Sequence, residues 1–124
     1  MISETELRGL MCPPTFFDVR YKINPQMART LQSYKKVDKI KAFEQWMRLS
    51  LLLQNAWVRL SYLPPHPNFP DMPFTANAGF PYPGGIIVSS FRHPERQGES
   101  LETGRYFSEV LGLPAQRLPP RDYE

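Results

Sequence analysis

The clearest hydrophobic pattern along the chain lies between residues 38 and 55. Apolar side chains recur there at spacings of three and four positions, which is the repeat of one helix face. Charged side chains occupy the remaining face. We therefore predict an amphipathic helix over 38–55 whose apolar stripe packs into a core. The stripe consists of Val37, Ile40, Phe43, Met47 and Leu51, widened by Trp46, Leu49 and Leu53.

Alternation of apolar and polar residues predicts four strands. Residues 17–23 alternate cleanly, and residues 58–62 alternate directly after the predicted helix. Two further strands are expected near 73–80 and 84–91. The segment Tyr82-Pro83-Gly84-Gly85 between them has the residues of a turn, so these two strands are expected to be joined by it.

The order of the elements indicates the fold class. A second, weaker helix is expected over 100–111, closed by Gly112 and Pro114, and a short extended tail follows. The order of strand, helix, strand, strand, strand, helix and short strand indicates an α/β protein with helices packed on mixed sheets. Residues 1–13 show no strong pattern, and we expect a flexible lead-in there, followed by one folded region over 14–124.

The composition is that of a globular chain of one domain. The 124 residues are 41% hydrophobic and 22% charged, and 14 of them are proline, which predicts frequent loops and short extended pieces. The net charge is +3, but no block of Lys and Arg is longer than two residues. A solvated basic surface is therefore expected, and a nucleic-acid partner is not.

Three further features of the sequence bear on the cellular location and on the presence of a metal or cofactor. A single cysteine cannot form an internal disulfide, which favours a reducing compartment, so a cytoplasmic location is expected. The opening Met1-Ile2-Ser3-Glu4 is not that of a signal peptide, and no apolar run is long enough for a membrane span. Two scattered histidines do not make a metal site and Gly84-Gly85 is not a phosphate-binding loop, so neither a metal nor a cofactor is expected.

Two stretches contain polar residues suited to binding. In residues 70–79, Asn77 falls on the polar face of a predicted strand, and Gly79 beside it leaves room for a close approach. A small amide in that position can be directed into a pocket. In residues 91–99, two arginines, of which Arg96 is the second, follow an apolar run and lie among residues typical of a strand-end loop.

Together with Met11-Cys12-Pro13-Pro14 and residues 18–25, these two stretches resemble the amino-terminal portion of the guanidine-modifying enzymes of the pentein superfamily. That superfamily includes arginine dihydrolases, arginine deiminases, dimethylarginine dimethylaminohydrolases and amidinotransferases. The resemblance runs from about Met11 to the last residue. It implies an α/β-propeller of five strand-strand-helix-strand units, of which this chain would supply about two. The sequence itself shows no convincing internal repeat.

The resemblance also implies a chemistry and a set of site residues. Enzymes of this kind attack the central carbon of a guanidinium with a cysteine thiolate, assisted by a histidine and by carboxylates. Carried over position by position, Asn77 matches the contact to the guanidinium, and Arg96 matches the arginine that pairs with the substrate carboxylate. Asp71 matches a further acidic substrate contact, and Asn24 is a candidate contact to the amino-acid end of the substrate.

Each of these four residues has a purely structural alternative, which the sequence leaves open. Asn77 could hydrogen-bond a neighbouring loop, and Arg96 could be an ordinary surface arginine. Asp71 follows a proline and could be a turn residue or a cap, and Asn24 could belong to an Asn-Pro turn.

Cys12 is not expected to be the nucleophile. In the resembled enzymes the catalytic cysteine and histidine lie far later in the chain, and Cys12 matches a non-catalytic opening motif, so we predict a buried structural cysteine. The sequence departs from the resembled pattern in three places, one of which is Tyr82-Pro83-Gly84-Gly85, a longer turn than the resemblance implies. Asn68-Phe69 stands where Gly-Leu is usual, and Pro73 replaces an apolar strand residue and removes a backbone donor.

We therefore expect a truncated or split amidinotransferase-like or arginine-hydrolase-like protein. It would contain part of an arginine-type substrate pocket but not the catalytic cysteine and histidine, and the chain alone would be inactive. Two alternatives are kept. The first is a non-catalytic module that binds an arginine-like ligand or a protein. The second is a subunit completed by a partner chain or by self-association through open sheet edges.

Overall fold

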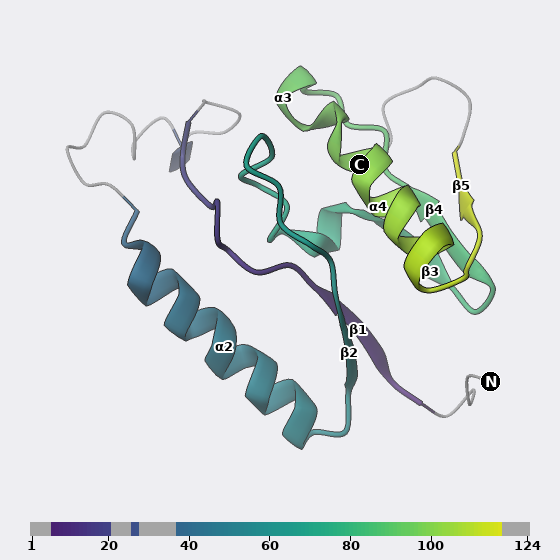
Figure 1. Cartoon of the computed structure of the whole chain (residues 1–124), viewed down its shortest axis with the longest axis horizontal. Helices are drawn as coiled ribbons and strands as arrows, with labels where there is room; N and C mark the ends of the chain where they lie inside the picture. Colours follow the sequence, from purple (N-terminus) through teal and green to yellow (C-terminus); the bar gives the residue numbers. More distant parts are fainter. Residues whose placement is uncertain (1–5, 21–25, 28–36, 118–124) are drawn as a thin grey trace. The chain divides into compact units, whose positions relative to one another are not determined.

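The computed structural model describes residues 6–20, 26–27 and 37–117. The chain divides into two compact units, residues 1–73 and residues 74–124. Both units contain helices and strands (Figure 1), so the predicted α/β class is confirmed.

In the first unit, two parallel strands are joined by a crossover that contains a long helix. Strand β1 (Arg8–Met11) pairs with β2 (Arg59–Tyr62), and helix α2 (Lys39–Asn55) lies next to β2 (Figure 1). Parallel pairing needs such a crossover, because strands that run in the same direction cannot be joined by a tight turn. The hydroxyl groups of Ser50 and Tyr62 hydrogen-bond at 3.0 Å and tie the helix to the sheet.

The predicted helix over 38–55 is confirmed as α2, and a residue just before it sets its start. Asp38 has extended backbone geometry, and its Oδ1 accepts a hydrogen bond from the backbone N–H of Lys41 at 3.0 Å. This contact satisfies one of the four N–H groups that have no partner inside the helix. The strand predicted over 58–62 is also confirmed, as β2.

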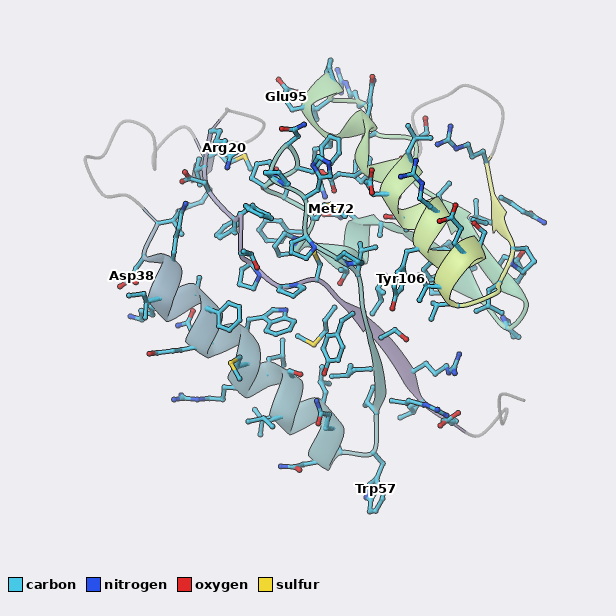
Figure 2. The ribbon with its side chains drawn as sticks, viewed as in Figure 1. Arg20, Asp38, Trp57, Met72, Glu95 and Tyr106 are labelled. Atoms are coloured by element: carbon cyan, nitrogen blue, oxygen red, sulfur yellow. The ribbon has the colours of Figure 1, made fainter. Side chains whose placement is uncertain are left out.

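The end of α2 is a Schellman motif with an unusual residue at its centre. The N–H of Trp57 donates to the carbonyl of Gln54, and the N–H of Val58 donates to the carbonyl of Leu53, both at 3.0 Å. Trp57 takes the position usually filled by glycine and has a φ of 65°. Its side chain is 90% exposed and points away from the ribbon (Figure 2). The indole therefore gains little from packing while its backbone is strained.

The second unit contains a three-stranded sheet with a helix packed against it. The first two strands form an antiparallel hairpin through the turn predicted at residues 82–85, and the last strand pairs in parallel with the middle one. The helix packs against the middle and last strands. The elements are β3 (Gly79–Tyr82), β4 (Gly85–Val88), β5 (Ala115–Gln116) and α4 (Glu99–Arg105), which continues into a π-helical turn, η2 (Tyr106–Val110).

Two single turns complete the second unit. One is a 3₁₀ turn, η1 (Thr75–Asn77), directly before β3, and the other is the short helix α3 (Pro94–Gln97), directly before α4. Figure 2 shows Glu95 at the outer end of α3. The two turns matter because they hold Asn77 and Arg96.

Each unit has a small buried core. The sheet and helix of the second unit enclose Ile86, Val88 and Phe107. In the first unit, Cys12 is fully buried, which confirms the prediction of a buried cysteine, and its Sγ lies 3.7 Å from the carbonyl oxygen of Pro13. Buried apolar neighbours of the same unit are Met11, Leu63 and Met72.

The structure corrects the predicted lead-in and the first predicted strand. Residues 1–13 were expected to be flexible, but Arg8–Met11 form β1. Their backbone groups are satisfied by a strand some fifty positions later, a contact that no local pattern reveals. Residues 17–20 form no strand, although residues 17–23 were predicted as one. The remaining residues of that segment, 21–23, lie outside the described part of the chain.

The third correction concerns residues 73–80, which were predicted as a strand. Residues 75–77 form the 3₁₀ turn η1, and the strand begins only at Gly79. Because Pro73 has no N–H and restricts the residue before it, the backbone enters this segment as a turn.

The apolar stripe of α2 is not packed into a core, so that prediction was wrong for this chain. Ile40 is 76% exposed, and of the 17 residues of the helix only Ser50 is buried. A two-stranded sheet is too narrow to cover the stripe, and it leaves an open groove of about 290 Å³ between α2, Pro13 and Tyr62. No helix in the described residues is both long enough and apolar enough to cross a membrane.

We predict that Trp57→Gly stabilises the first unit. Glycine adopts a φ of 65° without the steric penalty of a Cβ, and removal of the exposed indole loses little burial. The expected gain is about 1 kcal/mol, or roughly 4 °C in Tm. Thermal unfolding followed by circular dichroism measures it. Ala56→Gly is the matched control. Ala56 has a negative φ of −90°, so glycine relieves no strain there and the variant should be less stable than the unmodified chain. A lower Tm for Trp57→Gly would contradict the strain argument.

Candidate functional site

Asn77 lies on a turn that presents its side chain to solvent. It is the last residue of η1, and its N–H donates to the carbonyl of Phe74 at 3.0 Å. The residue is exposed. The sequence predicted an amide on the polar face of a strand, from which it could be directed into a pocket, whereas the structure places it on a turn before the strand.

Arg96 is directed toward Asn77 by the short helix α3. Pro94 occupies the first helical position, where its missing N–H removes no helical hydrogen bond, and His93 precedes it with extended geometry. The Nη1 group of Arg96 donates to Oδ1 of Asn77 at 3.2 Å. The guanidinium also stacks over the ring of Phe91, with its central carbon 4.3 Å from the ring centroid. Two residues nineteen positions apart in the sequence therefore meet in one cluster.

Glu99 holds the guanidinium of Arg96 from the other side. Nε of Arg96 donates to Oε2 of Glu99 at 2.8 Å, and Nη2 donates to Oε1 at 2.9 Å, so the pair is bidentate. The side chains are only 12% and 5% exposed, respectively. A planar guanidinium bound through two parallel hydrogen bonds has little freedom to rotate. The carboxylate of Glu99 therefore both neutralises the charge of Arg96 and sets the orientation of its guanidinium.

A second set of hydrogen bonds fixes the backbone of Asn77. The hydroxyl of Ser89 donates to the carbonyl oxygen of Asn77, and the backbone N–H of Ser89 donates to the carbonyl of Ala78 at 3.0 Å. The hydroxyl of Ser100, in α4, donates in turn to the carbonyl oxygen of Ser89. Both serines are buried. Asn77 is therefore held through its backbone by the end of β4 and through its side chain by Arg96.

Gly79 was expected to leave room for a close approach, and the structure shows what approaches it. A Cβ at this position would lie 2.5 Å from the carbonyl oxygen of Ile87 and 2.9 Å from Cδ1 of Ile86. The space is therefore filled by the facing strand of the hairpin. The glycine allows β4 to pack closely against the turn that holds Asn77.

The structure brings together two of the four predicted site residues. Asn77 and Arg96 are in contact in the second unit. Asp71 belongs to the first unit, where it lies in the turn at 70–73 and is 1% exposed. Asn24 lies outside the described residues.

The described residues also include types that commonly bind metal ions. His66 accepts a hydrogen bond at Nδ1 from the N–H of Asn68 at 3.1 Å, and its ring packs in a tilted arrangement against Phe69. Among the described residues, no group of three or more His, Cys, Asp and Glu side chains is arranged to hold a metal ion.

Sequence reasoning missed Glu99, Ser89 and Ser100. A signal for Glu99 was present, because Pro94 marks a helix start and the spacing of three between Arg96 and Glu99 then places them on one face. No comparable signal marks the two serines, because their partners are backbone carbonyl groups of segments distant in sequence.

Comparison with known proteins finds related sequences of far greater length. The chain is 41% identical over 116 residues to the bifunctional arginine dihydrolase/ornithine cyclodeaminase AgrE of Nostoc and 38% identical over 114 residues to its counterpart ArgZ of Synechocystis. These matches span 93% and 92% of the chain but only 16% of each relative. It is also 38% identical over 103 residues to a dimethylarginine dimethylaminohydrolase of Mycobacterium tuberculosis, of which it covers 33%. No family model matches the chain.

Solved structures of the AgrE and ArgZ relatives resemble most of the chain. A complex of an AgrE cysteine-to-alanine mutant with L-arginine matches with a TM-score of 0.84 at 36% identity, covering 96% of this chain and 17% of the other. The amino-terminal domain of ArgZ bound to product also matches with a TM-score of 0.84, at 34% identity, and the chain covers 42% of it. An asparagine-to-serine mutant of that domain, covalently bonded to a reaction intermediate, matches with a TM-score of 0.80, at 34% identity, over 92% of this chain and 40% of the other.

We predict that Gly79→Ala destabilises the second unit. The added methyl group collides with the backbone of Ile87, which cannot move without breaking the hairpin, and the expected loss is about 2 kcal/mol. Urea unfolding measures this loss. Gly104→Ala is the matched control, because a Cβ there would make ordinary van der Waals contact with Cβ of Ala115, at 3.7 Å, and alanine favours the helix. Equal stability of the two variants would refute a packing role for Gly79.

Proposed function

The chain belongs to the pentein superfamily of arginine dihydrolases and dimethylarginine dimethylaminohydrolases, and on that premise we propose that it forms part of a pocket for an arginine-type guanidino compound. In this proposal Asn77 contacts the guanidinium end of the ligand and Arg96 contacts the carboxylate end. Asp71 and Asn24 are secondary candidates. The chain supplies these binding groups without completing a catalytic site.

The observation on which the proposal rests is the contact between Asn77 and Arg96. The resemblance implies that both residues contact one ligand, and their side chains lie 3.2 Å apart in one hydrogen-bonded cluster. An amide and a guanidinium side by side offer one group suited to each end of an amino acid that carries a guanidine.

The relatives support the choice of ligand. One of them is described in complex with L-arginine, and another is an asparagine mutant covalently bonded to a reaction intermediate. The first indicates that an arginine pocket exists in the relatives. In the second, serine replaces an asparagine, which is the residue type found at position 77 of this chain.

We further propose that the chain alone does not turn over its ligand. Its one cysteine, Cys12, is fully buried, and a thiol without solvent access cannot reach a guanidinium carbon. The chain spans 16% of the length of the bifunctional relatives and 42% of the ArgZ amino-terminal domain. Release of ammonia, citrulline or ornithine from arginine, lost in Cys12→Ala, would overturn this proposal.

We predict weak binding of L-arginine by the isolated chain, because only part of the pocket is present. A dissociation constant in the millimolar range is expected, about −4 kcal/mol. Titration of the isotope-labelled chain with L-arginine, followed by NMR, should shift the signals of Asn77 and of its neighbours. Agmatine, which lacks the carboxylate, and ornithine, which lacks the guanidine, should each bind more weakly than arginine.

Two variants test the assignment of the residues. Asn77→Ala should abolish the arginine-dependent shifts. Arg105→Ala should leave them unchanged, because Arg105 lies on α4 as an exposed arginine with only a 4.0 Å contact to Glu102. If arginine causes no shifts at concentrations well above the millimolar range, the pocket proposal is wrong.

A second candidate function is favoured by the exposed stripe of α2. Apolar side chains that follow one helix face at 39% to 76% exposure form a surface that soluble monomers rarely leave uncovered. We propose that further polypeptide covers this face, either a partner chain or a second copy. In this case the chain is a subunit of a larger assembly.

We predict that the purified chain self-associates when no such polypeptide is present. Light scattering coupled to size-exclusion chromatography should show a mass that rises with concentration. Leu51→Lys, which places a charge within the stripe, should lower that mass, whereas Gln45→Lys on the polar face should not. A monodisperse monomer of the unmodified chain at high concentration would argue against this candidate function.

A further inference from the structure

We propose that Glu99 is a positioning residue: acting through Arg96, it fixes the orientation of the Asn77 side-chain amide. The consequence for ligand binding rests on the function proposed above. The structural part rests only on the hydrogen bonds of the second unit. Glu99 itself is buried and is not proposed to touch a ligand.

The first step is the immobilisation of Arg96. Glu99 is the first residue of α4, so the helix fixes its backbone, and both of its carboxylate oxygens accept from Arg96. The ring of Phe91 lies against the face of the guanidinium, and the side chain of Gln97 donates to the carbonyl of Phe91 at 3.2 Å. Two parallel hydrogen bonds and a stacked ring together define the plane of the guanidinium.

The second step is the orientation of Asn77. The Nη1 group of Arg96 is only a donor, so the Asn77 amide must face it with its oxygen, and the NH₂ group is directed away from Arg96. Since the backbone of Asn77 is held by Ser89, rotation of the side chain is the freedom that remains, and Arg96 removes it.

The third step is the effect on binding. A surface asparagine rotates and presents its oxygen and its nitrogen in turn, so a ligand must order the amide when it binds. An amide that is already ordered avoids this cost and holds the second lone pair of Oδ1, which a ligand guanidinium would donate to, in a fixed position. Asn77 is exposed while Glu99 and most of Arg96 are buried, so the ordering comes from beneath the surface.

The test compares Glu99→Gln with Glu102→Gln. Glu102 also pairs with an arginine three positions away on the same helix, but that contact is long, at 4.0 Å, and exposed. Glutamine at position 99 places an NH₂ donor opposite one of the donors of Arg96, so the bidentate pairing is lost. The measured quantity is the proton–nitrogen NOE of the Asn77 side-chain amide, assigned by its absence in Asn77→Ser.

In the unmodified chain and in Glu102→Gln, we expect the NOE of the Asn77 side-chain amide to be close to the NOE of the rigid backbone. In Glu99→Gln, we expect it to fall to the value of a mobile side chain. The affinity for L-arginine should fall roughly five- to tenfold in Glu99→Gln and stay constant in Glu102→Gln. An Asn77 amide that remains rigid in folded Glu99→Gln overturns the proposal.

A second variant decides the question if Glu99→Gln does not fold. Arg96→Lys keeps a positive charge next to Glu99, but one ammonium group cannot hold Glu99 and Asn77 in a fixed plane. The Asn77 amide should become mobile while the NMR spectrum of the rest of the unit is retained, and a rigid amide in this variant overturns the proposal. Failure of the unmodified chain to bind arginine would refute the pocket, whereas the NOE would still test the positioning role.

Discussion

The buried pair of Arg96 and Glu99 is the interaction on which the polar cluster of the second unit depends. Burying a single charge is costly, whereas a bidentate pair in which the charges and hydrogen bonds match can be accommodated in a protein interior. The pair joins α3 to α4 and at the same time aligns a donor with Asn77. One contact thus serves both the packing of two short helices and the geometry of an exposed amide.

In the first unit the apolar surface of α2 is only partly covered by other residues. The two-stranded sheet of this unit holds α2 through β2, yet most of the helix stripe faces solvent. In the second unit a three-stranded sheet and α4 bury Ile86, Val88 and Phe107, so its polar cluster stands on a packed base. The pairing of candidate binding residues therefore lies in a unit whose helix has a sheet to pack against.

The candidate site was predictable in its residue types but not in its arrangement. The amide at Asn77 and the guanidinium at Arg96 stand out in the sequence, because each lies in a motif that resembles a known superfamily. Neither the turn that presents Asn77 nor the carboxylate that holds Arg96 was predicted. The turn follows from Pro73 and from the packing of Gly79 against Ile87, whereas the carboxylate had a local signal, its spacing of three from Arg96 after the helix start at Pro94.

The sequence by itself determined the local elements whose signals lie within a few residues. These are the helix capped by Asp38, the strand after it and the hairpin at Pro83-Gly84, because hydrophobic period, capping and turn chemistry act over short distances. Only the tertiary structure decided that Arg8–Met11 form a strand, that the α2 stripe stays exposed and that Ser89 and Glu99 support Asn77. The strand and the support of Asn77 depend on contacts with residues distant in the sequence, and the exposure of the stripe reflects missing cover within the described residues. Contacts of this long-range kind leave no periodic signal in the sequence.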